Sequence, residues 1–393
     1  MIMQSKHLNL ISNSLKKKYH IVHWRLKNKD LNPFSIKPIM QVYFYPNYSR
    51  DNPYQLLLYS ACKQKGIRCT PSKIDDVISS KMNISNSIFH LHWTAPILRP
   101  AKNQTDAINL KNEFIHMIDK FKKKGGKFVW TIHNILPHNA SFENEEVKLR
   151  KEIIKRADKI HIHSSAALTK VEGMFPISKD KSVIINHGNY IGVYPNKKDR
   201  ENSKRKLGID KNDFVFLYFG QIRPNKGLSN MIKTFHDITN EEKNIKLIIA
   251  GKLKPPLKSG DLKILVQNNR NIILHEKYIK NRDIQSYFNA SDIVILPSEN
   301  VLTSGSVMLA LSFSRPVIVP NIDTLKEVIK DSYNGWIYNT NKTHDLKQII
   351  KKCLGYDRQE LIQFNKNAFD MAFKYDWSQL SLQLVDKIHS LCT

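Results

Sequence analysis

Short apolar runs rich in β-branched residues recur along the chain, and segments with helical periodicity separate them. In the first half, strands are expected at residues 39–45, 88–93, 128–133, 159–163 and 183–185. Unbroken apolar runs are typical of parallel strands that helices bury on both faces, whereas half-exposed strands alternate apolar and polar positions. The first half is therefore predicted to be an α/β domain with a parallel sheet.

The same pattern starts again in the second half of the chain. Strands are expected there at residues 213–220, 246–251, 271–276, 292–298 and 315–320. Before them, residues 187–210 lack strong periodicity and contain glycine, proline and a charged run, which is typical of a surface connection. A second parallel α/β domain is predicted to follow this connection.

The length of 393 residues also favours two domains, because a single compact core rarely grows beyond about 250–300 residues. We divide the chain into an N-terminal domain (1–190), a linker (191–210), a C-terminal domain (211–375) and a final helix (376–393). That helix can pack back on the N-terminal domain. Residues 1–38 carry no readable pattern and are interpreted as a leader.

The charge of the chain is strongly positive, with 62 Lys and Arg against 35 Asp and Glu and a formal net charge of +27. Such a charge attracts phosphates, nucleic acid or an anionic membrane face. The basic residues are mostly Lys, are spread over the whole length and accompany abundant Asn and Ile. We therefore interpret part of the charge as compositional bias and predict no specific nucleic-acid partner.

Cysteine usage and hydropathy indicate a cellular compartment. Cys62, Cys69, Cys353 and Cys392 form no CxxC pair and have no His at metal-ligand spacing, which favours reduced thiols and disfavours a structural zinc. No run of about 20 apolar residues is present, and the first residues lack the apolar core of a secretory signal. We expect a cytoplasmic protein that can associate peripherally with the inner face of the plasma membrane.

The loop FGQIRPNKG is the first candidate binding site, because ligands of open parallel sheets bind beyond the carboxyl ends of the strands. Gly220 ends the strand, and Arg223 and Lys226 follow on a tight polar loop. Two cations at a rigid strand end can stabilise the negative charge of a departing diphosphate. A basic surface turn in a Lys-rich chain is the alternative.

The loop before RPVIVP is the second candidate site. Its small residues Thr303, Ser304, Gly305 and Ser306 lead into an apolar helix, whose first amides and dipole favour phosphate. Ordinary Ser or Thr capping explains the same residues without a ligand. Just upstream, Glu299 can bind ribose or sugar hydroxyls.

Four elements of this half follow the order found in the donor-binding domain of the GT-B glycosyltransferases. They are the loop G-x-x-x-x-x-K-G, the strand KLIIAG, the segment HEKYIKNRDIQSYFNASDIVILPS and the small-residue loop before RPVI. Over residues 214–338 the chain resembles these enzymes, especially glycosyltransferase family 4. The resemblance implies two Rossmann-like domains whose parallel sheets face a central cleft. It also implies that the segment around Tyr278 and Ile279 holds the nucleobase of a nucleotide-sugar donor.

One departure from the family concerns its two glutamates, which stand eight residues apart. The positions that correspond to them are Val301 and Leu309, and neither is acidic. Glu299 lies two residues before the first position and is a candidate replacement with a catalytic role. The retaining outcome that is usual for the family therefore stays open, and so does inversion.

Histidines follow two strands of the first domain, in IFHLHWTAP and KFVWTIHNILPHN. The family carries a histidine that contacts the transferred sugar, and Thr131-Ile132-His133 matches its position, so His133 is the leading catalytic candidate. A neutral imidazole can also deprotonate an acceptor hydroxyl, as an inverting mechanism requires. His92 and His138 are candidates for acceptor binding, with a structural role equally open.

The segment YPNYSRDNPYQLLLY follows the first expected strand, and related polysaccharide transferases carry a similar N-P-Y segment. In the GT-B arrangement this loop faces the cleft, so Asn47, Arg50 and Asn52 are candidates for acceptor binding. Asp51 is a candidate base. Helix capping by Asn52 is the alternative that needs no ligand.

These features favour a glycosyltransferase that moves a sugar from a UDP- or GDP-sugar to a saccharide or polyprenyl-diphosphate-linked acceptor in cell-surface polysaccharide synthesis. No metal or other cofactor is expected, because no DxD carboxylate pair stands near a strand end. A sugar-nucleotide epimerase on the same fold is the first alternative. A nucleic-acid-binding protein is the second, although the dispersed Lys residues disfavour it. The sugar, the nucleotide, the acceptor and the anomeric outcome stay open.

Overall fold

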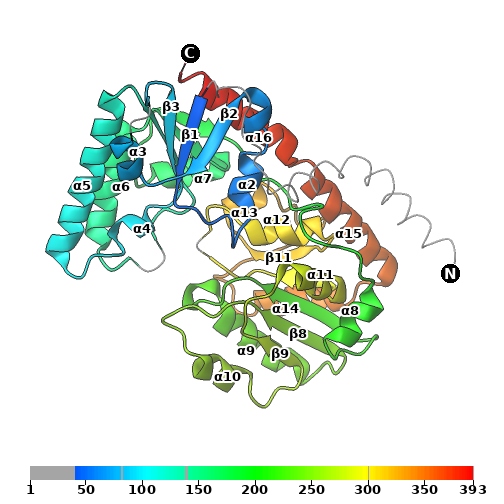
Figure 1. The fold of residues 1–393 in the computed structure, drawn as a ribbon. Helices are drawn as coiled ribbons and strands as arrows, with labels where there is room; N and C mark the ends of the chain where they lie inside the picture. Colours follow the sequence, from blue (N-terminus) through cyan, green and yellow to red (C-terminus); the bar gives the residue numbers. More distant parts are fainter. Residues whose placement is uncertain (1–39, 81–82, 138–139, 300, 393) are drawn as a thin grey trace.

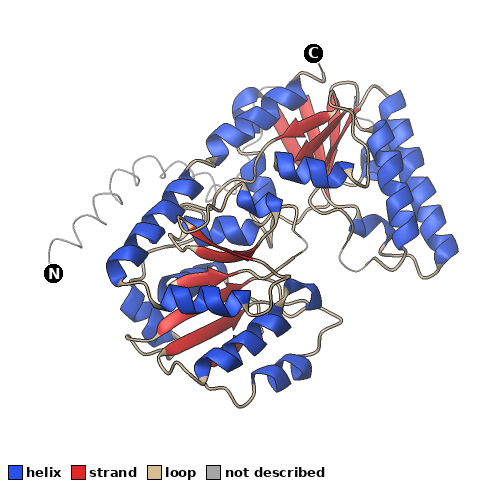
Figure 2. Cartoon of the chain, turned by 180° about the vertical axis from the view of Figure 1, so that it is seen from behind, coloured by secondary structure: helices blue, strands red, loops and turns tan. Residues whose placement is uncertain are grey.

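A computed structural model describes residues 40–80, 83–137, 140–299 and 301–392 of the chain. They form two α/β domains, each with a parallel sheet that helices cover on both faces (Figures 1 and 2). The expected α/β class with two parallel sheets is therefore confirmed. Residues 1–38, interpreted as a leader, lie outside the described residues.

The described part of the N-terminal domain contains a six-stranded sheet in the order β2-β1-β3-β4-β5-β6. Its strands are β1 (Met40–Tyr45), β2 (Ile67–Pro71), β3 (Ser87–Leu91), β4 (Lys127–Thr131), β5 (Lys159–Ile162) and β6 (Ser182–Ile184). Because β2 and β3 lie on opposite sides of β1, the strand order reverses between β1 and β3. Such a switch point opens a crevice at the carboxyl ends of the strands.

The described part of the C-terminal domain repeats this plan with the strand order β12-β11-β10-β7-β8-β9. Its strands are β7 (Phe214–Phe219), β8 (Ile245–Ala250), β9 (Ile272–His275), β10 (Ile293–Ile295), β11 (Val317–Pro320) and β12 (Gly335–Tyr338). The order reverses between β7 and β10. The loops after these two strands are those that the sequence singled out for phosphate binding.

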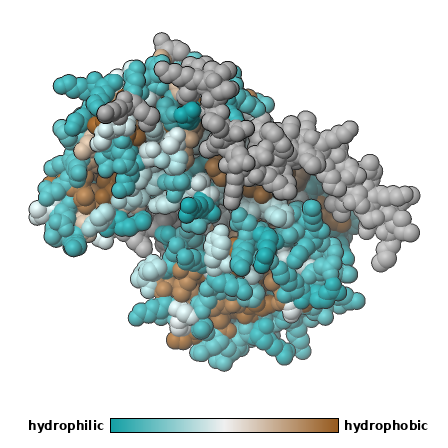
Figure 3. Space-filling model, in the orientation of Figure 1, coloured by the Kyte–Doolittle hydropathy of each residue, from teal (hydrophilic) through white to brown (hydrophobic). Residues whose placement is uncertain are grey.

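Helices fill both faces of each sheet. In the first domain they are α2 (Tyr54–Leu58), the 3-10 turn η1 (Cys62–Lys65), α3 (Ile74–Ser79), α4 (Ala95–Leu98), α5 (Gln104–Lys123), α6 (Glu143–Arg156) and α7 (Ser165–Glu172). After it come α8 (Arg200–Lys206), η2 (Pro224–Lys226), α9 (Leu228–Thr239), α10 (Ser259–Val266), α11 (Asn281–Ala290), α12 (Gly305–Ser312), α13 (Asp323–Lys326), α14 (Asp345–Leu354), α15 (Arg358–Phe373) and α16 (Trp377–His389). The face drawn in Figure 3 is mostly hydrophilic, with smaller apolar patches on both domains.

Two strands, β2 and β12, were not expected from the sequence. Each is the outermost strand of its sheet, so one of its edges has no strand partner among the described residues. In β2, Ile67 is buried while Arg68 is exposed. An edge strand buries fewer side chains than a central one, and its apolar signal is correspondingly weak.

The segment expected to be an irregular linker, 191–210, differs from that expectation because it contains α8. This helix packs against α11 of the C-terminal domain. Arg200 Nη2 lies 2.6 Å from Asp292 Oδ1, and Lys206 Nζ lies 2.5 Å from Asp283 Oδ1. The charged run that indicated a solvated connection thus leads into a helix that ion pairs anchor to the second domain, and its Lys204 is buried.

The chain returns to the N-terminal domain at its end, where α15 and α16 run along both domains (Figure 1). In α16, Ser381 Oγ donates to the Leu58 carbonyl at 2.7 Å and accepts from the Ala61 amide at 2.9 Å. Trp377 Nε1 donates to the Asn189 carbonyl at 2.7 Å. A side chain at Gly188 would meet the Trp377 ring at 2.4 Å, so this approach requires glycine.

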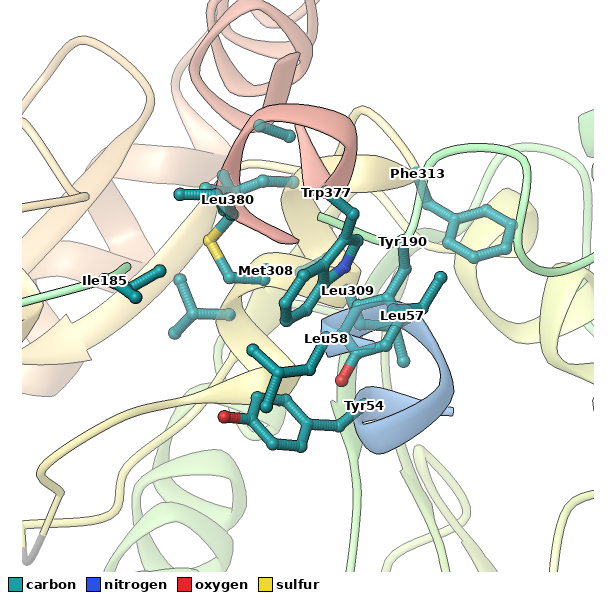
Figure 4. Close-up of a cluster of buried hydrophobic side chains, with 14 of the residues drawn as sticks. Tyr54, Leu57, Leu58, Ile185, Tyr190, Met308, Leu309, Phe313, Trp377 and Leu380 are labelled. Atoms are coloured by element: carbon teal, nitrogen blue, oxygen red, sulfur yellow. The ribbon is translucent and has the colours of Figure 1, made fainter. Parts of the chain in front are cut away.

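Apolar side chains from α2, α12 and α16 gather at the junction of the two domains (Figure 4). Tyr54 and Leu58 come from the first domain, Met308 and Leu309 from the second, and Trp377 from the last helix. All five are buried. Burial of apolar side chains is the main stabilising contribution in such a cluster, and it connects the two sheets across their facing carboxyl ends.

Candidate active site

A cleft of about 790 Å³ lies between the two domains, at the carboxyl ends of both sheets. Its first wall comes from the loops after β1, β3, β4 and β6, together with α7. Its second wall comes from the loops after β7 and β10 and from the start of α12. The volume lies in the range of pockets that hold small-molecule ligands.

The loop after β7 brings Gly220, Arg223 and Lys226 to the second wall. Gly220 has φ +151°, and a side chain there would lie 3.4 Å from Ser306 Oγ of the neighbouring loop. Gly227 ends this loop with φ +69°, and a side chain there would meet the Pro297 carbonyl at 2.3 Å. Positive φ and close backbone approach both require glycine, so these residues hold the two loops together.

The two cations of this loop are held without a counter-charge. Burial lowers the pKa of Arg223 and of Lys226, and the positive charge of Arg223 lowers the pKa of Lys226 further. Within the described ranges no carboxylate pairs with either side chain, and the buried Nε of Arg223 has no hydrogen-bond partner. Lys226 Nζ lies 3.5 Å from Ser298 Oγ. A bound anion would satisfy both cations.

Thr303, Ser304, Gly305 and Ser306 also line the second wall, where α12 begins. Ser304 Oγ accepts from the Val307 amide at 3.2 Å, so it is a helix cap as the alternative interpretation requires. The cap leaves the first turn of α12 facing the cleft. All seven residues expected to bind the diphosphate therefore lie together on one wall.

The positions that correspond to the two family glutamates, Val301 and Leu309, line the cleft and are apolar. Glu299, expected to replace one of them, is exposed and does not line the cleft. Tyr278 is 50% exposed and Ile279 is buried, and neither belongs to the cleft lining. Glu299 thus lies on the loop after β10 but outside the cleft lining, as Tyr278 and Ile279 do, and the roles assigned to these three residues stay predictions.

On the first wall, His133 lines the cleft directly after β4. Its ring stacks on Trp93, with centroids 4.1 Å apart and planes within 12°. The Tyr54 ring meets it edge-on at 5.1 Å. Burial lowers the pKa of His133 well below its ordinary value, and nearby histidines lower it further. His133 is therefore a neutral, clamped imidazole at neutral pH.

His92, expected to bind the acceptor, is instead buried behind His133 and does not line the cleft. Its Nε2 lies 2.8 Å from the Tyr59 hydroxyl and its Nδ1 lies 3.3 Å from His133 Nε2. Both ring nitrogens are therefore used within the protein. His92, just after β3, lies beneath the surface that His133 covers, which agrees with the structural role left open from the sequence; its role in acceptor binding stays a prediction. His138, the third candidate, lies outside the described residues.

The loop after β1 contributes Asp51 and Asn52 to the cleft, whereas Asn47 and Arg50 are exposed and do not line it. Asn47 Oδ1 accepts from the amide and the hydroxyl of Ser49, at 3.1 and 2.7 Å. Asn52 Oδ1 accepts from the Tyr54 amide at 3.0 Å, a local bond at the start of α2. Asp51 lines the cleft, and its carboxylate accepts no such local hydrogen bond from the described residues.

The structure also brings to the cleft Tyr54, His187 and Tyr190, which were given no role from the sequence. His187 and Tyr190 lie next to the start of α12, because a side chain at Gly305 would approach His187 Nε2 to 3.5 Å and the Tyr190 hydroxyl to 3.2 Å. Burial lowers the pKa of His187 to about 4. The signal in the sequence was the His-Gly turn after β6, which a hinge explains equally well.

Neither a metal site nor a membrane span is found in the described parts of the chain. No group of three or more His, Cys, Asp or Glu side chains there is arranged to hold a metal ion. Over the same ranges, none of the helices combines the length and the apolar character that crossing a bilayer requires.

Comparison with known proteins places the cleft in a family. Residues 199–371, which contain the loops after β7 and β10, match the family model described as glycosyl transferases group 1. This match supports a group 1 glycosyltransferase. The resemblance stated from the sequence is therefore confirmed at this level, and the narrower assignment to family 4 stays a prediction. Neither the epimerase nor the nucleic-acid alternative is favoured.

Among curated proteins, the transferase is similar to GDP-mannose:glycolipid 4-β-D-mannosyltransferase of Xanthomonas campestris pv. campestris. The two are 25% identical over 296 residues, which is 75% of this chain and 76% of the relative. It is also similar to the capsular polysaccharide biosynthesis glycosyltransferase CapM of Staphylococcus aureus. That match is 24% identical over 181 residues, or 45% of this chain and 47% of CapM.

Solved structures establish that the fold of the transferase is GT-B. Sucrose-phosphate synthase from Thermosynechococcus elongatus superposes with a TM-score of 0.67 at 13% identity, over 90% of this chain and 99% of the other. Anabaena Alr3699/HepE in complex with UDP-glucose superposes with a TM-score of 0.66 at 16% identity, over 89% and 100%. At these identities the likeness shows the fold alone.

Proposed function

We propose that the transferase moves a hexose from a nucleotide-diphosphate sugar to a hydroxyl of a saccharide, in the assembly of a cell-surface polysaccharide. The observation that carries this proposal is the meeting of Arg223, Lys226 and the start of α12 on one wall of the cleft, across from His133. A diphosphate on the second wall would leave its sugar directed toward the first wall.

Arg223 and Lys226 are proposed to bind the diphosphate and to stabilise the charge that develops on it as the sugar leaves. These half-buried cations, which have no carboxylate partner among the described residues, gain from an anion, and the amides at the start of α12 add hydrogen-bond donors. The Anabaena neighbour is described in complex with UDP-glucose, which supports a nucleotide sugar as the ligand of this fold. UDP- and GDP-sugars are both candidate donors.

His133 is proposed to act as the general base. The acceptor oxygen would form a bond to the anomeric carbon, the bond from that carbon to the diphosphate would break, and the hydroxyl proton would pass to the imidazole. The low pKa of His133 makes it a weak base in the empty cleft. Negative charge from a bound diphosphate would raise that pKa toward neutrality. Asp51, also on the first wall, is the alternative base.

An inverting outcome is proposed, because the cleft has apolar Val301 and Leu309 where the family has glutamates. The β-linkage in the name of the Xanthomonas relative agrees with inversion of an α-linked donor. Proton NMR of the product reads the anomeric configuration. We expect it to be opposite to that of the donor, and retention would overturn this part of the proposal.

The acceptor is proposed to be a saccharide on a polyprenyl diphosphate, with the transferase peripheral at the cytoplasmic face of the membrane. The net charge of +27 favours contact with anionic lipid, and the Xanthomonas relative is named for a glycolipid acceptor. CapM is named for capsular polysaccharide biosynthesis, which supports a cell-surface product.

The first experiment is thermal-shift and hydrolysis profiling of the protein with UDP-, GDP- and other nucleotide sugars. We expect one nucleotide class to stabilise the wild type, and Arg223→Ala and Lys226→Ala to lose most of that stabilisation. Each charged hydrogen bond contributes about 1.5–3 kcal/mol, or about 10- to 100-fold in affinity. Arg270→Ala, at an exposed position outside the cleft, is the matched control and should respond like the wild type. No stabilisation by any nucleotide would overturn the proposal.

A further inference from the structure

Three neighbouring strands of the first sheet each place two polar side chains on the same face at their carboxyl ends. The pairs are His90 in β3 with His92 just beyond it, Thr131 in β4 with His133 just beyond it, and His161 in β5 with His163 just beyond it. Residues two apart on a strand point to the same face, and these strands are adjacent in the sheet. The six side chains therefore form a compact polar layer behind the cleft.

Hydrogen bonds connect five of these side chains and Tyr59 into one chain that starts at a backbone carbonyl. His161 Nε2 lies 2.9 Å from the Ile185 carbonyl, and His161 Nδ1 lies 3.0 Å from Thr131 Oγ1. The Thr131 hydroxyl lies 2.7 Å from His90 Nε2, and His90 Nδ1 lies 2.7 Å from the Tyr59 hydroxyl. The same Tyr59 hydroxyl continues the chain to His92.

The carbonyl at one end gives this chain a single direction. A carbonyl can only accept, so His161 donates from Nε2 and must accept at Nδ1 from Thr131. Thr131 then accepts from His90 Nε2, and His90 accepts at Nδ1 from Tyr59. Each neutral imidazole has one donor and one acceptor nitrogen, and each hydroxyl donates one hydrogen, so no member can reverse alone.

Continued to its end, the chain determines the tautomer of His133. Tyr59 accepts from His92 Nε2, so His92 Nδ1 must accept from His133 Nε2, 3.3 Å away. His133 thus carries its hydrogen on Nε2 and its lone pair on Nδ1. Among the described residues, Nδ1 has no hydrogen-bond partner, and His133 lines the cleft.

The order of donors and acceptors requires neutral side chains, and every side chain in the series is neutral at neutral pH. His90, His92 and His161 are buried and His133 is partly buried, and burial lowers the pKa of each, to about 4 for His161. Tyr59 is buried as well, and burial raises its pKa well above the ordinary value. At neutral pH, neither an imidazolium nor a phenolate interrupts the order of donors and acceptors.

A shorter branch starts from the same carbonyl. His163 Nδ1 lies 3.2 Å from the Ile185 carbonyl, so His163 Nε2 accepts from the Tyr54 hydroxyl at 3.3 Å. Tyr54 lines the cleft, and its hydroxyl donates its single hydrogen to His163. Both branches therefore end in hydrogen-bond acceptors at the cleft, His133 Nδ1 and the Tyr54 oxygen, which suits a ligand that donates from hydroxyls.

We propose that Tyr59, Thr131, His90, His92 and His161 are positioning residues, which hold His133 in the tautomer whose Nδ1 lone pair faces the acceptor hydroxyl. This inference deepens the proposed function and rests on the role of His133 as base. A catalytic imidazole in the wrong tautomer keeps its place but cannot take the proton. None of the five needs to touch the substrate.

The test interrupts the series of hydrogen bonds at its middle and measures the tautomer of His133 directly. Histidines are labelled with ¹⁵N, and the ring-nitrogen shifts of His133, assigned with His133→Gln, report which nitrogen carries the hydrogen. We expect the Nε2–H form in the wild type. In Thr131→Val the carbonyl no longer orients the rest of the chain, so His133 should gain the Nδ1–H form. Tyr59→Phe breaks the chain one step nearer and should have the same effect.

Kinetics decide whether the tautomer matters for transfer. With Thr131→Val and Tyr59→Phe, kcat should fall about 10- to 100-fold while KM for the donor stays within about twofold. Thr131→Ser keeps a hydroxyl and should restore both the tautomer and kcat. Thr234→Val is the matched control, because that buried hydroxyl bonds only to the Asn230 carbonyl in α9. It should leave both readouts unchanged.

The outcomes separate this inference from the proposed function. Two results would overturn the proposed order of hydrogen bonds even if nucleotide sugars stabilise the protein. They are an Nδ1–H form of His133 in the wild type, and an unchanged tautomer in both Thr131→Val and Tyr59→Phe. A changed tautomer with unchanged kcat would overturn the positioning role. Loss of nucleotide stabilisation in Arg223→Ala is independent of all these results, since that residue lies on the other wall.

Discussion

The first wall of the cleft is built from rings, whereas the second wall is built from cations, small residues and the start of a helix. Behind the first wall, buried His and Tyr side chains are joined by hydrogen bonds that cross three strands. On the second wall, glycines let two loops approach each other, and no carboxylate of the described residues pairs with Arg223 or Lys226. The layer of side chains behind the first wall is neutral and is held by side-chain hydrogen bonds, whereas the second wall carries two cations and is held by close backbone approach.

This difference matches what the two halves of a transfer reaction require. A leaving diphosphate is stabilised by positive charge and amide donors fixed in place. An acceptor hydroxyl requires a neutral acceptor that can take a proton, and a nearby cation would weaken it. Separate domains allow the two environments to face each other without mixing their charges. The following predictions test this contrast, starting with the largest expected effect.

Acidification should destabilise the first domain more than the second. Burial lowers the pKa of His161 and of His187 to about 4, against about 6.5 in an unfolded chain. Unfolding therefore takes up protons between these values, so stability is complete above pH 6.5 and is lost as the pH falls toward 4. Each of the two histidines should contribute on the order of 3 kcal/mol to this loss.

Thermal melts from pH 7.5 to 4.5 measure the loss, and amide hydrogen exchange locates it. We expect amides of β4 and β5 to lose protection at a higher pH than amides of β8 and β10. Equal protection of both sheets throughout the titration would show that the contrast between the walls does not extend to stability.

Removal of the proposed base should separate chemistry from donor binding. His133→Ala should lower kcat/KM about 10²- to 10⁴-fold, because a positioned general base contributes that much. Stabilisation by the nucleotide should persist, since the diphosphate loops are on the other wall. His116→Ala, an exposed histidine on α5, is the control. Full activity of His133→Ala would shift the role of base to Asp51.

The dependence of the second wall on backbone approach can be tested at Gly251. A side chain there would lie 1.6 Å from the Gly220 carbonyl, so Gly251→Ala must displace the loop that carries Arg223. We expect a loss of about 1–3 kcal/mol in unfolding free energy, as for other overpacked sites, together with weaker nucleotide binding. At Gly260 a side chain would meet nothing within 4 Å. Gly260→Ala should therefore be near neutral in denaturant unfolding, and an equal loss in both variants would contradict the steric argument.

The smallest effect is expected where charge is kept and geometry is changed. Arg223→Lys retains the cation on the second wall but loses the planar fork that can bind two phosphate oxygens. Donor KM should rise about tenfold, which corresponds to about one lost charge-assisted hydrogen bond, with kcat much less affected. An unchanged KM in steady-state assays would mean that charge alone, and not the fork, holds the diphosphate.

The sequence was most informative where a binding residue directly follows a buried strand. The apolar runs before Gly220, Pro297 and His133 predicted strands, and the loops after them predicted cleft residues. These predictions depend on short contiguous segments, because a strand, the loop after it and the start of the next helix together span only about 20 residues. The edge strand β2 escaped notice since partial burial leaves a weak apolar pattern, whereas β12 is largely buried but has only four residues.

The sequence by itself thus determined two parallel α/β domains and placed His133 and the two loops proposed to bind the diphosphate at the carboxyl ends of strands. Only the tertiary structure decided that His92 is buried, that Glu299 lies outside the cleft lining, and that Tyr54 and His187 belong to it. It also decided the donor and acceptor order from Ile185 to His133. Those facts depend on contacts between strands that are tens of residues apart, and the sequence pattern near each residue carries no record of its neighbours across the sheet.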